Sequence, residues 1–302
     1  MAKLTVEQAT RHRKAQDLVE LDRELTVSER EFVLDNWMES ATARLDGAFF
    51  TPPGLAHDLR LEVTGKRVID LCAGIGRLAW ACQDTEWERL NGEPPRELVC
   101  VERNPEYVRV GKKVLPEATW ICADVFEVPD MDLGQFDTAI GNPPYGAVYR
   151  HGRNSPRYTG GRFEYHVIDI AAEVARNGVF IIPQEMAPFR YSGNTSFIEQ
   201  RTAPYDRFER QTGIVLGFGI GIDTSYYANE WRDAAPNTEV VRADFEGVRV
   251  QGGKKAARTA NTAEPAKGWR SAASSTNSAK TKSVMSAVGD DSATGTIGLF
   301  DI

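Results

Sequence analysis

The chain has few cysteines, no long apolar run and no excess of basic residues, and each absence excludes a class of protein. The four cysteines are Cys72, Cys82, Cys100 and Cys122. They form no Cys-x-x-Cys pair, so we expect no metal site and no disulfide framework, but reduced core residues. No stretch is apolar enough to span a bilayer, and the N-terminus lacks the apolar segment of a signal peptide, so we expect a cytoplasmic protein with no membrane partner. A net charge of −7 argues against binding polyanions over the whole surface, although a local basic patch can still contact nucleic acid.

What the sequence does contain is a regular alternation of two kinds of segment. Residues 1–45 carry apolar side chains at helical spacing. From Lys66 onward, apolar runs of strand length alternate with helical stretches. This pattern predicts an α/β fold with a doubly wound, Rossmann-like sheet of mostly parallel strands, covered by helices on both faces. Two later runs, 212–222 and 238–248, predict a final strand pair that extends the sheet.

Composition divides the chain into four parts. Residues 1–46 form a helical N-terminal arm, and residues 47–250 form the packed domain. Residues 251–295 are mainly small and polar with a basic bias, so we expect a disordered linker, because such a segment buries too little apolar surface to offset the entropy of ordering. Residues 296–302 turn apolar again and form a short terminal motif.

Carboxylates stand at the carboxyl ends of three successive predicted strands. The carboxylates are those of Asp70, Glu102 and Asp124. The first is followed by the glycine turn with Gly74 and Gly76, and the third is followed by the apolar Val125. The glycine turn lets a ligand approach the backbone, the second acid suits the hydroxyls of a ribose, and the third suits an adenine amine with an apolar neighbour against the ring. The glycine pattern alone also fits a dinucleotide site or a plain tight turn, and acids after strands often cap helices. Three acids in succession favour an adenosine-type pocket.

The fourth predicted strand ends in the stretch "GNPPYG", Gly141 to Gly146. The bland interpretation is a turn stiffened by proline. However, the amide oxygen of Asn142 and the carbonyl of Pro143 would form a pair of acceptors suited to the two hydrogens of one amino group. Holding an aromatic amine in this way frees its lone pair for attack on an electrophilic methyl, and Tyr145 would stack on a base flipped out of a duplex. We therefore predict catalysis by orientation and electrostatics at Asn142, Pro143 and Tyr145.

Together these motifs resemble a known family. "DLCAGIG", "VERN", "CADVF" and "GNPPYG", in this order, are similar to the motifs of class I S-adenosylmethionine-dependent methyltransferases that modify exocyclic or amide nitrogens. "GAFFTPPGLAHDL", residues 47–59, is similar to the Phe-x-Thr-Pro element of DNA adenine-N6 methyltransferases. The resemblance implies S-adenosyl-L-methionine as cofactor, a methyltransferase sheet and a bacterial or phage enzyme of the restriction-modification type. It adds Phe50, Thr51 and Pro52 to the cofactor site, beside the cofactor's methionine part.

The chain departs from this family in having no large target-recognition domain after the catalytic half. The best candidate for contact with double-stranded DNA is the loop 146–163. It interleaves aromatic residues with four arginines, a mixture suited to phosphates and bases, namely Arg150, Arg153, Arg157 and Arg162. The alternative is a solvated loop with incidental arginines.

The terminal motif suggests a second partner. Thr296, Ile297, Leu299 and Phe300 resemble the Gln-Leu-x-Leu-Phe peptides that dock on bacterial sliding clamps, with Thr in place of Gln. A short apolar motif on a flexible tether suits docking. The alternative for this motif is a tail that packs on its own domain. For the linker 251–295, two interpretations stay open: it scans DNA through phosphate contacts, or its charges merely keep it solvated.

The sequence therefore predicts an adenine-specific DNA methyltransferase acting on N6, and two other interpretations stay open. The first keeps the cofactor chemistry but targets a protein glutamine or an RNA base. The second is a non-catalytic DNA-binding or clamp-associated protein that retains the fold. A nicotinamide-dependent dehydrogenase is disfavoured, because no convincing proton donor stands beside a hydride acceptor.

Overall fold

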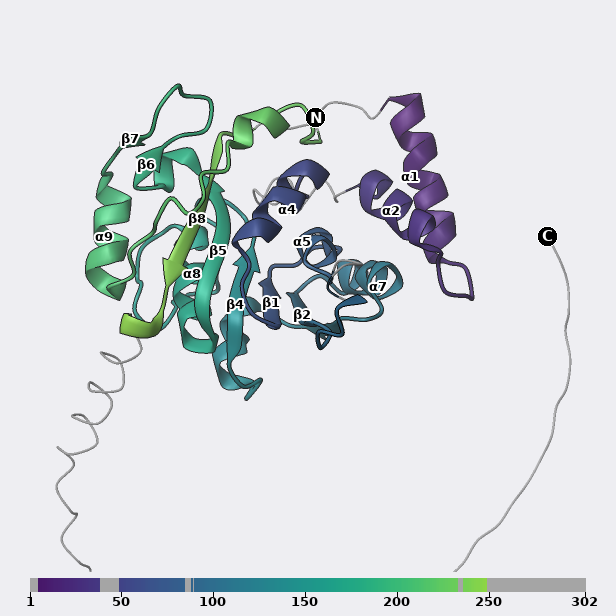
Figure 1. Ribbon diagram of the computed structural model, residues 1–302, viewed down its shortest axis with the longest axis horizontal. Helices are drawn as coiled ribbons and strands as arrows, with labels where there is room; N and C mark the ends of the chain where they lie inside the picture. Colours follow the sequence, from purple (N-terminus) through teal and green to yellow (C-terminus); the bar gives the residue numbers. More distant parts are fainter. Residues whose placement is uncertain (1–4, 39–48, 85–87, 89, 233–235, 249–302) are drawn as a thin grey trace, which may run out of the picture. The chain divides into compact units, whose positions relative to one another are not determined.

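The computed structural model describes residues 5–38, 49–84, 88, 90–232 and 236–248, and the rest of the chain is the thin grey trace in Figure 1. The described residues all belong to one compact unit of the chain. The predicted linker 251–295 and the terminal motif 296–302 lie outside the described residues, as do the last residues of the predicted N-terminal arm.

A six-stranded sheet in the order β3-β2-β1-β4-β5-β8 organises the fold (Figure 1). The pairs from β3 to β5 are parallel, and β8 runs antiparallel to β5. The strands are β1 (Arg67–Leu71), β2 (Glu97–Glu102), β3 (Thr119–Cys122), β4 (Phe136–Gly141), β5 (Ala175–Pro183) and β8 (Thr238–Asp244). The predicted doubly wound, mostly parallel sheet is confirmed.

Helices cover both faces of the sheet, and successive strand residues point to opposite cores. In β1, Ile69 and Leu71 belong to the core that includes α8, whereas Val68 belongs to the core that includes α5 and α7. Because both faces are covered, the central strands β1, β2, β4 and β5 are mostly apolar on both faces. The helices of the domain are α4 (Pro53–Leu59), α5 (Arg77–Ala81), α7 (Pro105–Val114), α8 (Phe163–Val174) and α9 (Ala203–Thr212), with the 3-10 segments η1 (Arg60–Glu62) and η2 (Val125–Asp130).

The N-terminal arm contains α1 (Val6–Val19) and α2 (Val27–Asn36). Each begins at a threonine that accepts a hydrogen bond from a backbone N–H of the first turn, Thr5 for α1 and Thr26 for α2. Arg30 of α2 forms an ion pair with Glu117 at 2.7 Å, and Asp35 forms one with Arg77 of α5 at 2.5 Å. The arm is thus packed against the domain on the face that carries α5 and α7.

The chain between β5 and β8 departs from the prediction. It forms η3 (Gln184–Met186), a small sheet of β6 (Phe189–Arg190) and β7 (Ile198–Glu199), then α9 and η4 (Thr224–Tyr227). The strand predicted for 212–222 is wrong, since only Gly217 pairs with a strand residue, Arg242 of β8. Gly219 and Gly221 adopt positive φ angles of 62° and 81°, which interrupts the extended backbone that a ladder needs. The partner strand predicted for 238–248 is confirmed as β8.

The cysteines were only partly predicted. Cys82 and Cys100 are buried core residues, whereas Cys72 is half-buried and Cys122 is exposed. The prediction of a core position is wrong for Cys122 because β3 is the edge strand of the sheet and Cys122 is its last residue. All four carry free thiols.

Candidate functional site

The strand order brings the predicted polar residues to one edge of the sheet. Strands β3, β2, β1 and β4 are neighbours and parallel, so their carboxyl ends meet along this edge. Asp124, Glu102, Asp70 and Asn142 follow one another in that order. Chain segments that are far apart in the sequence therefore form one continuous polar line.

The turn after β1 is built from left-handed glycines. Gly74 has a φ of 58°, and Gly76, the N-cap residue of α5, has a φ of 94°. A Cβ atom on Gly74 would lie 3.2 Å from the ring of Phe50. Glycine therefore allows both the turn and the close packing of Phe50 over it.

Glu102 ties the second strand to this turn. One of its carboxylate oxygens accepts a hydrogen bond from the Gly74 N–H at 2.9 Å, and the other accepts from the Asn104 N–H at 2.8 Å. Burial raises the pKa of Glu102, and these backbone donors counteract the rise. Each oxygen keeps a further lone pair, so the carboxylate can still accept from the hydroxyls of a ligand.

Asp70 is the most unusual group at this edge. It is only 1% exposed, and neither carboxyl oxygen makes a hydrogen bond to any part of the chain that the structure describes. Burial raises the pKa of Asp70 well above its usual range and the charge of Glu102 adds to the rise, while the nearby Ala79 N–H lowers it only in part. The Ala79 N–H thus gives the carboxyl only a weak interaction, and a buried carboxyl so poorly satisfied is costly, which indicates a group held ready for a donor that binds beside it.

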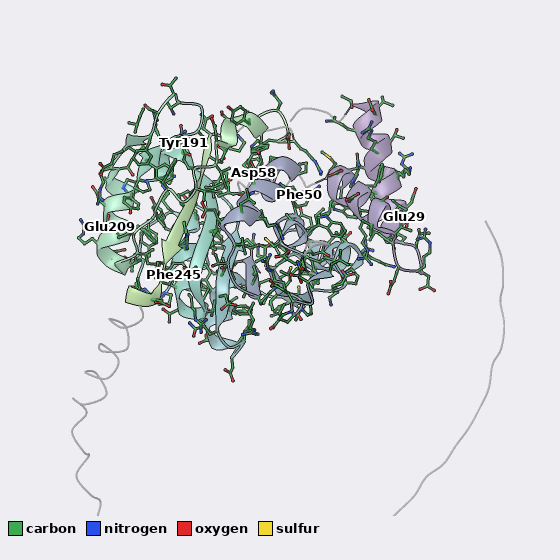
Figure 2. All side chains as sticks on the ribbon, viewed as in Figure 1. Glu29, Phe50, Asp58, Tyr191, Glu209 and Phe245 are labelled. Carbon is green, nitrogen blue, oxygen red and sulfur yellow. The ribbon has the colours of Figure 1, made fainter. Side chains whose placement is uncertain are left out.

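A pocket opens between the turn after β1 and the segment before α4. Figure 2 marks this segment by Phe50 before α4 and Asp58 within α4. The pocket is lined by Phe49, Phe50, Thr51, Asp70, Cys72, Ala73, Gly74, Ile75, Arg77, Leu78 and Asn142. Five residues predicted for the site thus share one pocket, and they come from the segment before α4, from β1, from the turn after β1 and from the end of β4. Pro52, also predicted, is buried next to Thr51 as the N-cap residue of α4.

Asn142 joins the end of β4 to the Phe-Phe-Thr-Pro segment. Its amide nitrogen donates to the Phe49 carbonyl and to the Thr51 hydroxyl, both at 3.0 Å. These two bonds use both hydrogens of the amide, so they fix its orientation and turn the Oδ1 atom the other way. Pro143, the next residue, is buried. The two motifs on which the family resemblance rests are therefore in direct contact.

Tyr145 stands beside that oxygen. Its hydroxyl donates to Asn142 Oδ1 at 2.6 Å, and its ring lies tilted against Phe49 with the centroids 6.1 Å apart. Burial raises the pKa of Tyr145 well above its usual range, and the charge of Glu164 adds to the rise. The phenol is thus a permanent hydrogen-bond donor at ordinary pH.

The residues after β3 form a short cap. Asp124 accepts from the Phe126 N–H at 3.1 Å as the N-cap residue of η2. Val125 is buried, and Phe126 packs edge-on against Phe163 of α8 with the ring centroids 6.0 Å apart. One oxygen of Asp124 thus serves the local turn, as an ordinary helix cap would.

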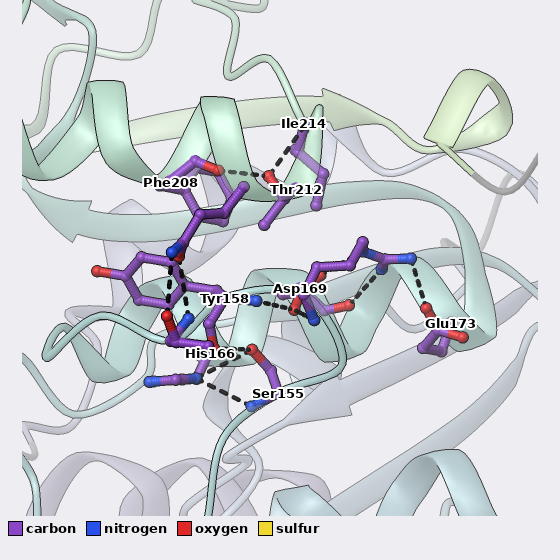
Figure 3. Close-up of polar contacts among 11 residues, drawn as sticks. Ser155, Tyr158, His166, Asp169, Glu173, Phe208, Thr212 and Ile214 are labelled. Carbon is purple, nitrogen blue, oxygen red and sulfur yellow. Dashed lines mark hydrogen bonds and ion pairs between the residues drawn. The ribbon is translucent and has the colours of Figure 1, made fainter. Parts of the chain in front are cut away.

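The loop 146–163, the arginine loop, is fixed by ion pairs to side chains of α8 (Figure 3). Arg157 forms ion pairs with Asp169 at 2.6 Å and with Glu173 at 2.7 Å. Asp169 is fully buried and also accepts from the Tyr158 N–H. Arg157, predicted to contact DNA, therefore has an intramolecular role that fixes the shape of the loop.

The other three arginines of the loop differ from one another. Arg150 donates to the Gly160 carbonyl and to groups of Arg153 and Asn154, which again shapes the loop. Arg153 is exposed and reaches Glu127 at 3.4 Å. Arg162 is half-buried at the N-cap position of α8. Only Arg153 presents an exposed side chain.

Three groups at the site were missed from the sequence. The Phe49 carbonyl accepts from Asn142, Trp231 packs edge-on against Phe49 with centroids 6.5 Å apart, and Glu164 accepts a backbone hydrogen bond from Gly146 at 2.9 Å. A backbone carbonyl leaves no signal in the sequence. Glu164 had a weak one, because it is an acid in the first turn of a helix most of whose residues are apolar.

Two features are absent from the part of the chain that the structure describes. Among the described residues, no helix is long and apolar enough to cross a membrane. Within the same residues, no three His, Cys, Asp or Glu side chains gather where they could hold a metal ion.

Solved structures share this architecture, whereas sequence comparison gives no relative. No protein-family model matches the sequence, and no curated protein sequence does. The structure resembles a Listeria monocytogenes protein assigned to the class I S-adenosylmethionine-dependent methyltransferases, with a TM-score of 0.52, 11% identity, and coverage of 80% of this chain and 81% of the other.

A second similar structure is the methyltransferase subunit of a type I restriction-modification system from Streptococcus thermophilus. The TM-score is 0.50 at 15% identity, over 72% of this chain and 48% of the other, so the match spans about half the length of that subunit. Identities this low establish the fold alone. The chain has the fold of the class I methyltransferases.

Proposed function

We propose that this protein transfers a methyl group from S-adenosyl-L-methionine to N6 of an adenine flipped out of double-stranded DNA. The observation that carries the proposal is the fixed orientation of Asn142. Because its amide nitrogen is saturated by Phe49 and Thr51, the side chain presents an oxygen, an acceptor, at the end of β4. An acceptor is what an amine substrate requires there.

The residues present fit the cofactor. Asp70 offers a buried carboxyl that the described residues satisfy only poorly, and it lines the same pocket as Phe50, Thr51 and Gly74. Asp70, Phe50, Thr51, Pro52, Gly74 and Gly76 would hold its methionine side, Glu102 its ribose, and Asp124 and Val125 its adenine. When bound, the cofactor supplies an electrophilic methyl group.

On the base side, the chain supplies acceptors and orientation. Asn142 Oδ1 has two lone pairs, so it can accept from the Tyr145 hydroxyl and from the substrate amine together. The Pro143 carbonyl would accept the second amine hydrogen. Held in this way, the nitrogen would direct its lone pair at the methyl group that the bound cofactor supplies, so that a C–N bond would replace the S–C bond and one amine proton would leave to water. Tyr145 would pack against the base.

For the nucleic acid around the base, we propose contacts from the tip of the arginine loop. Tyr149 is 76% exposed there and Arg153 of the same loop is exposed too, so the loop offers both an aromatic face and a cation. Arg162 is a further candidate. We also retain docking of residues 296–302 on a sliding clamp as a proposal from the sequence.

The proposal is tested by transfer of labelled methyl groups from S-adenosyl-L-methionine to unmethylated duplex DNA, with cofactor binding measured by calorimetry. Asn142→Ala should abolish transfer and leave cofactor affinity within about threefold, because Asn142 serves the base. The matched control is Asn177→Ala, since Asn177 is a half-buried asparagine near the amino end of β5 and donates to the Asp137 carbonyl. Loss of cofactor binding in Asn142→Ala alone would contradict the assigned role. Transfer to RNA or to a protein glutamine, with none to DNA, would refute the substrate.

A further inference from the structure

The last residue of the "GNPPYG" stretch is clamped by the first turn of α8. The Gly146 N–H donates to Glu164 Oε2 at 2.9 Å, and the Gly146 carbonyl accepts from the Phe163 N–H at 2.8 Å. At the other end of the stretch, the side-chain amide of Asn142 is hydrogen-bonded to Phe49 and Thr51. The segment between them, which includes Tyr145, is therefore held at both ends.

The carboxyl group of Glu164 that forms this clamp is costly to bury. Its side chain is 0% exposed, and Oε1, its second oxygen, has no hydrogen-bond partner in the described part of the chain. A glutamine or an apolar residue would satisfy a buried helix position at lower cost. The stability of the fold alone thus gives no reason for a carboxyl group here.

Glu164 interacts electrostatically with two charged side chains and three phenols around it. Arg162 favours its ionised form, and Glu185 opposes it. Burial raises the pKa of three surrounding phenols, and the charge of Glu164 adds to each rise; these phenols belong to Tyr145, Tyr158 and Tyr165. Tyr145 is the one that donates to Asn142 Oδ1. A path of direct contacts thus runs from Glu164 through Gly146 and Tyr145 to the acceptor of the substrate amine.

We propose that Glu164 is a positioning residue for methyl transfer, whose carboxylate fixes Gly146 and thereby aligns Tyr145 and Asn142 with the target amine. This inference rests on the proposed function of Asn142. The ionised carboxylate is the active form, because a hydrogen bond to a charged acceptor is shorter and about twice as strong as one to a neutral acceptor.

A pH dependence follows from the burial of this group. Burial raises the pKa of Glu164 to about 7, above its ordinary 4.5, although the Gly146 N–H and Arg162 counteract part of the rise. The active form therefore accumulates as the pH rises through neutrality. Transfer by the wild-type protein should increase about threefold between pH 6 and pH 8, which follows from titration of a single group near 7 whose neutral form keeps about a fifth of the activity.

The test compares wild type, Glu164→Gln and Glu164→Ala over pH 5.5 to 8.5, with kcat and KM for duplex DNA measured under saturating S-adenosyl-L-methionine. Glu164→Gln keeps a neutral acceptor for Gly146, so we expect kcat lowered about fivefold at pH 8 and no inflection near 7. Glu164→Ala should lose more than tenfold in kcat with KM for duplex DNA unchanged. The control is Glu62→Gln, since Glu62 is a buried carboxylate that accepts the Ile220 N–H away from the site. An inflection near 7 that persists in Glu164→Gln would overturn the proposal.

A second measurement separates this inference from the proposed function. Hydrogen exchange of the Gly146 amide needs no substrate. We expect its protection at pH 8 to fall at least tenfold in Glu164→Ala and to be kept in Glu62→Gln, whatever the protein methylates. Equal protection in wild type and Glu164→Ala would refute the clamp itself. If the wild-type protein is inactive on DNA although its Gly146 amide is protected, the substrate assignment is refuted instead.

Discussion

The buried carboxyl of Glu164 should make the stability of the fold depend on pH in a way that a single substitution removes. Its pKa is about 7 in the folded protein against an ordinary 4.5. The folded state therefore binds the proton more tightly than the unfolded state. The stabilisation is fully present below the unfolded pKa and is lost as the pH rises through the folded pKa.

The size of the effect follows from the two pKa values. A difference of about 2.5 pKa units corresponds to about 3 kcal/mol, of which about 2–3 kcal/mol is lost between pH 5 and pH 8. Since Glu164 is fully buried, solvent does not screen this contribution. Glu164→Gln does not titrate, so its free energy of unfolding relative to wild type should rise by that amount over this range.

The assay is urea unfolding at pH 5, 6, 7 and 8, followed by tryptophan fluorescence on both proteins in parallel. Comparing the two proteins at each pH cancels the titration of all other groups. Tyr165→Phe is the control, because burial raises the pKa of this neighbouring phenol and its hydroxyl donates to the Met186 carbonyl. That variant should lose about 1 kcal/mol equally at every pH. A constant difference between Glu164→Gln and wild type would refute the assignment of a raised pKa.

Three further predictions concern the site and its surroundings. Thr51→Val removes one acceptor of the half-buried Asn142 amide, so it should slow transfer by about 5- to 150-fold, equivalent to about 1–3 kcal/mol; an unchanged kcat would contradict the role of that bond. Arg157→Ala leaves Asp169 buried without its ion pair and should destabilise the fold by about 3–5 kcal/mol in urea unfolding. By contrast, Arg153→Ala should leave stability unchanged and lower the salt dependence of DNA binding by about one ion. The reverse pattern would mean that Arg157 is the DNA contact. Deleting residues 299–302 should abolish retention on an immobilised sliding clamp, and unchanged retention would remove that partner.

The sheet was predictable because its physical signature is local. The central strands β1, β2, β4 and β5 are buried over most of their length and so read as apolar runs, and α7 begins at Pro105, directly after an asparagine N-cap. Residues at strand ends were also predictable as a group, because the carboxyl ends of parallel strands share one edge. The predicted strand 212–222 failed because its apolar residues alternate with glycines that turn the backbone.

The tertiary contacts could not be predicted, because they depend on where distant segments meet. Nothing in the sequence indicates that the Phe49 carbonyl would saturate the amide of Asn142, or that Asp169 would claim Arg157 from the loop. The buried polar residues of α8 left only a weak signal, as acids in an otherwise apolar helix. Their roles follow from burial and hydrogen bonding, which only the three-dimensional structure supplies.

The most direct test of the central claim is nucleoside mass spectrometry of unmethylated bacterial DNA after incubation with the protein and isotope-labelled S-adenosyl-L-methionine. The account predicts label in N6-methyladenine, and none with Asn142→Ala. Label in a methylated cytosine would contradict the target base, and cofactor binding without label in DNA would contradict the proposed substrate.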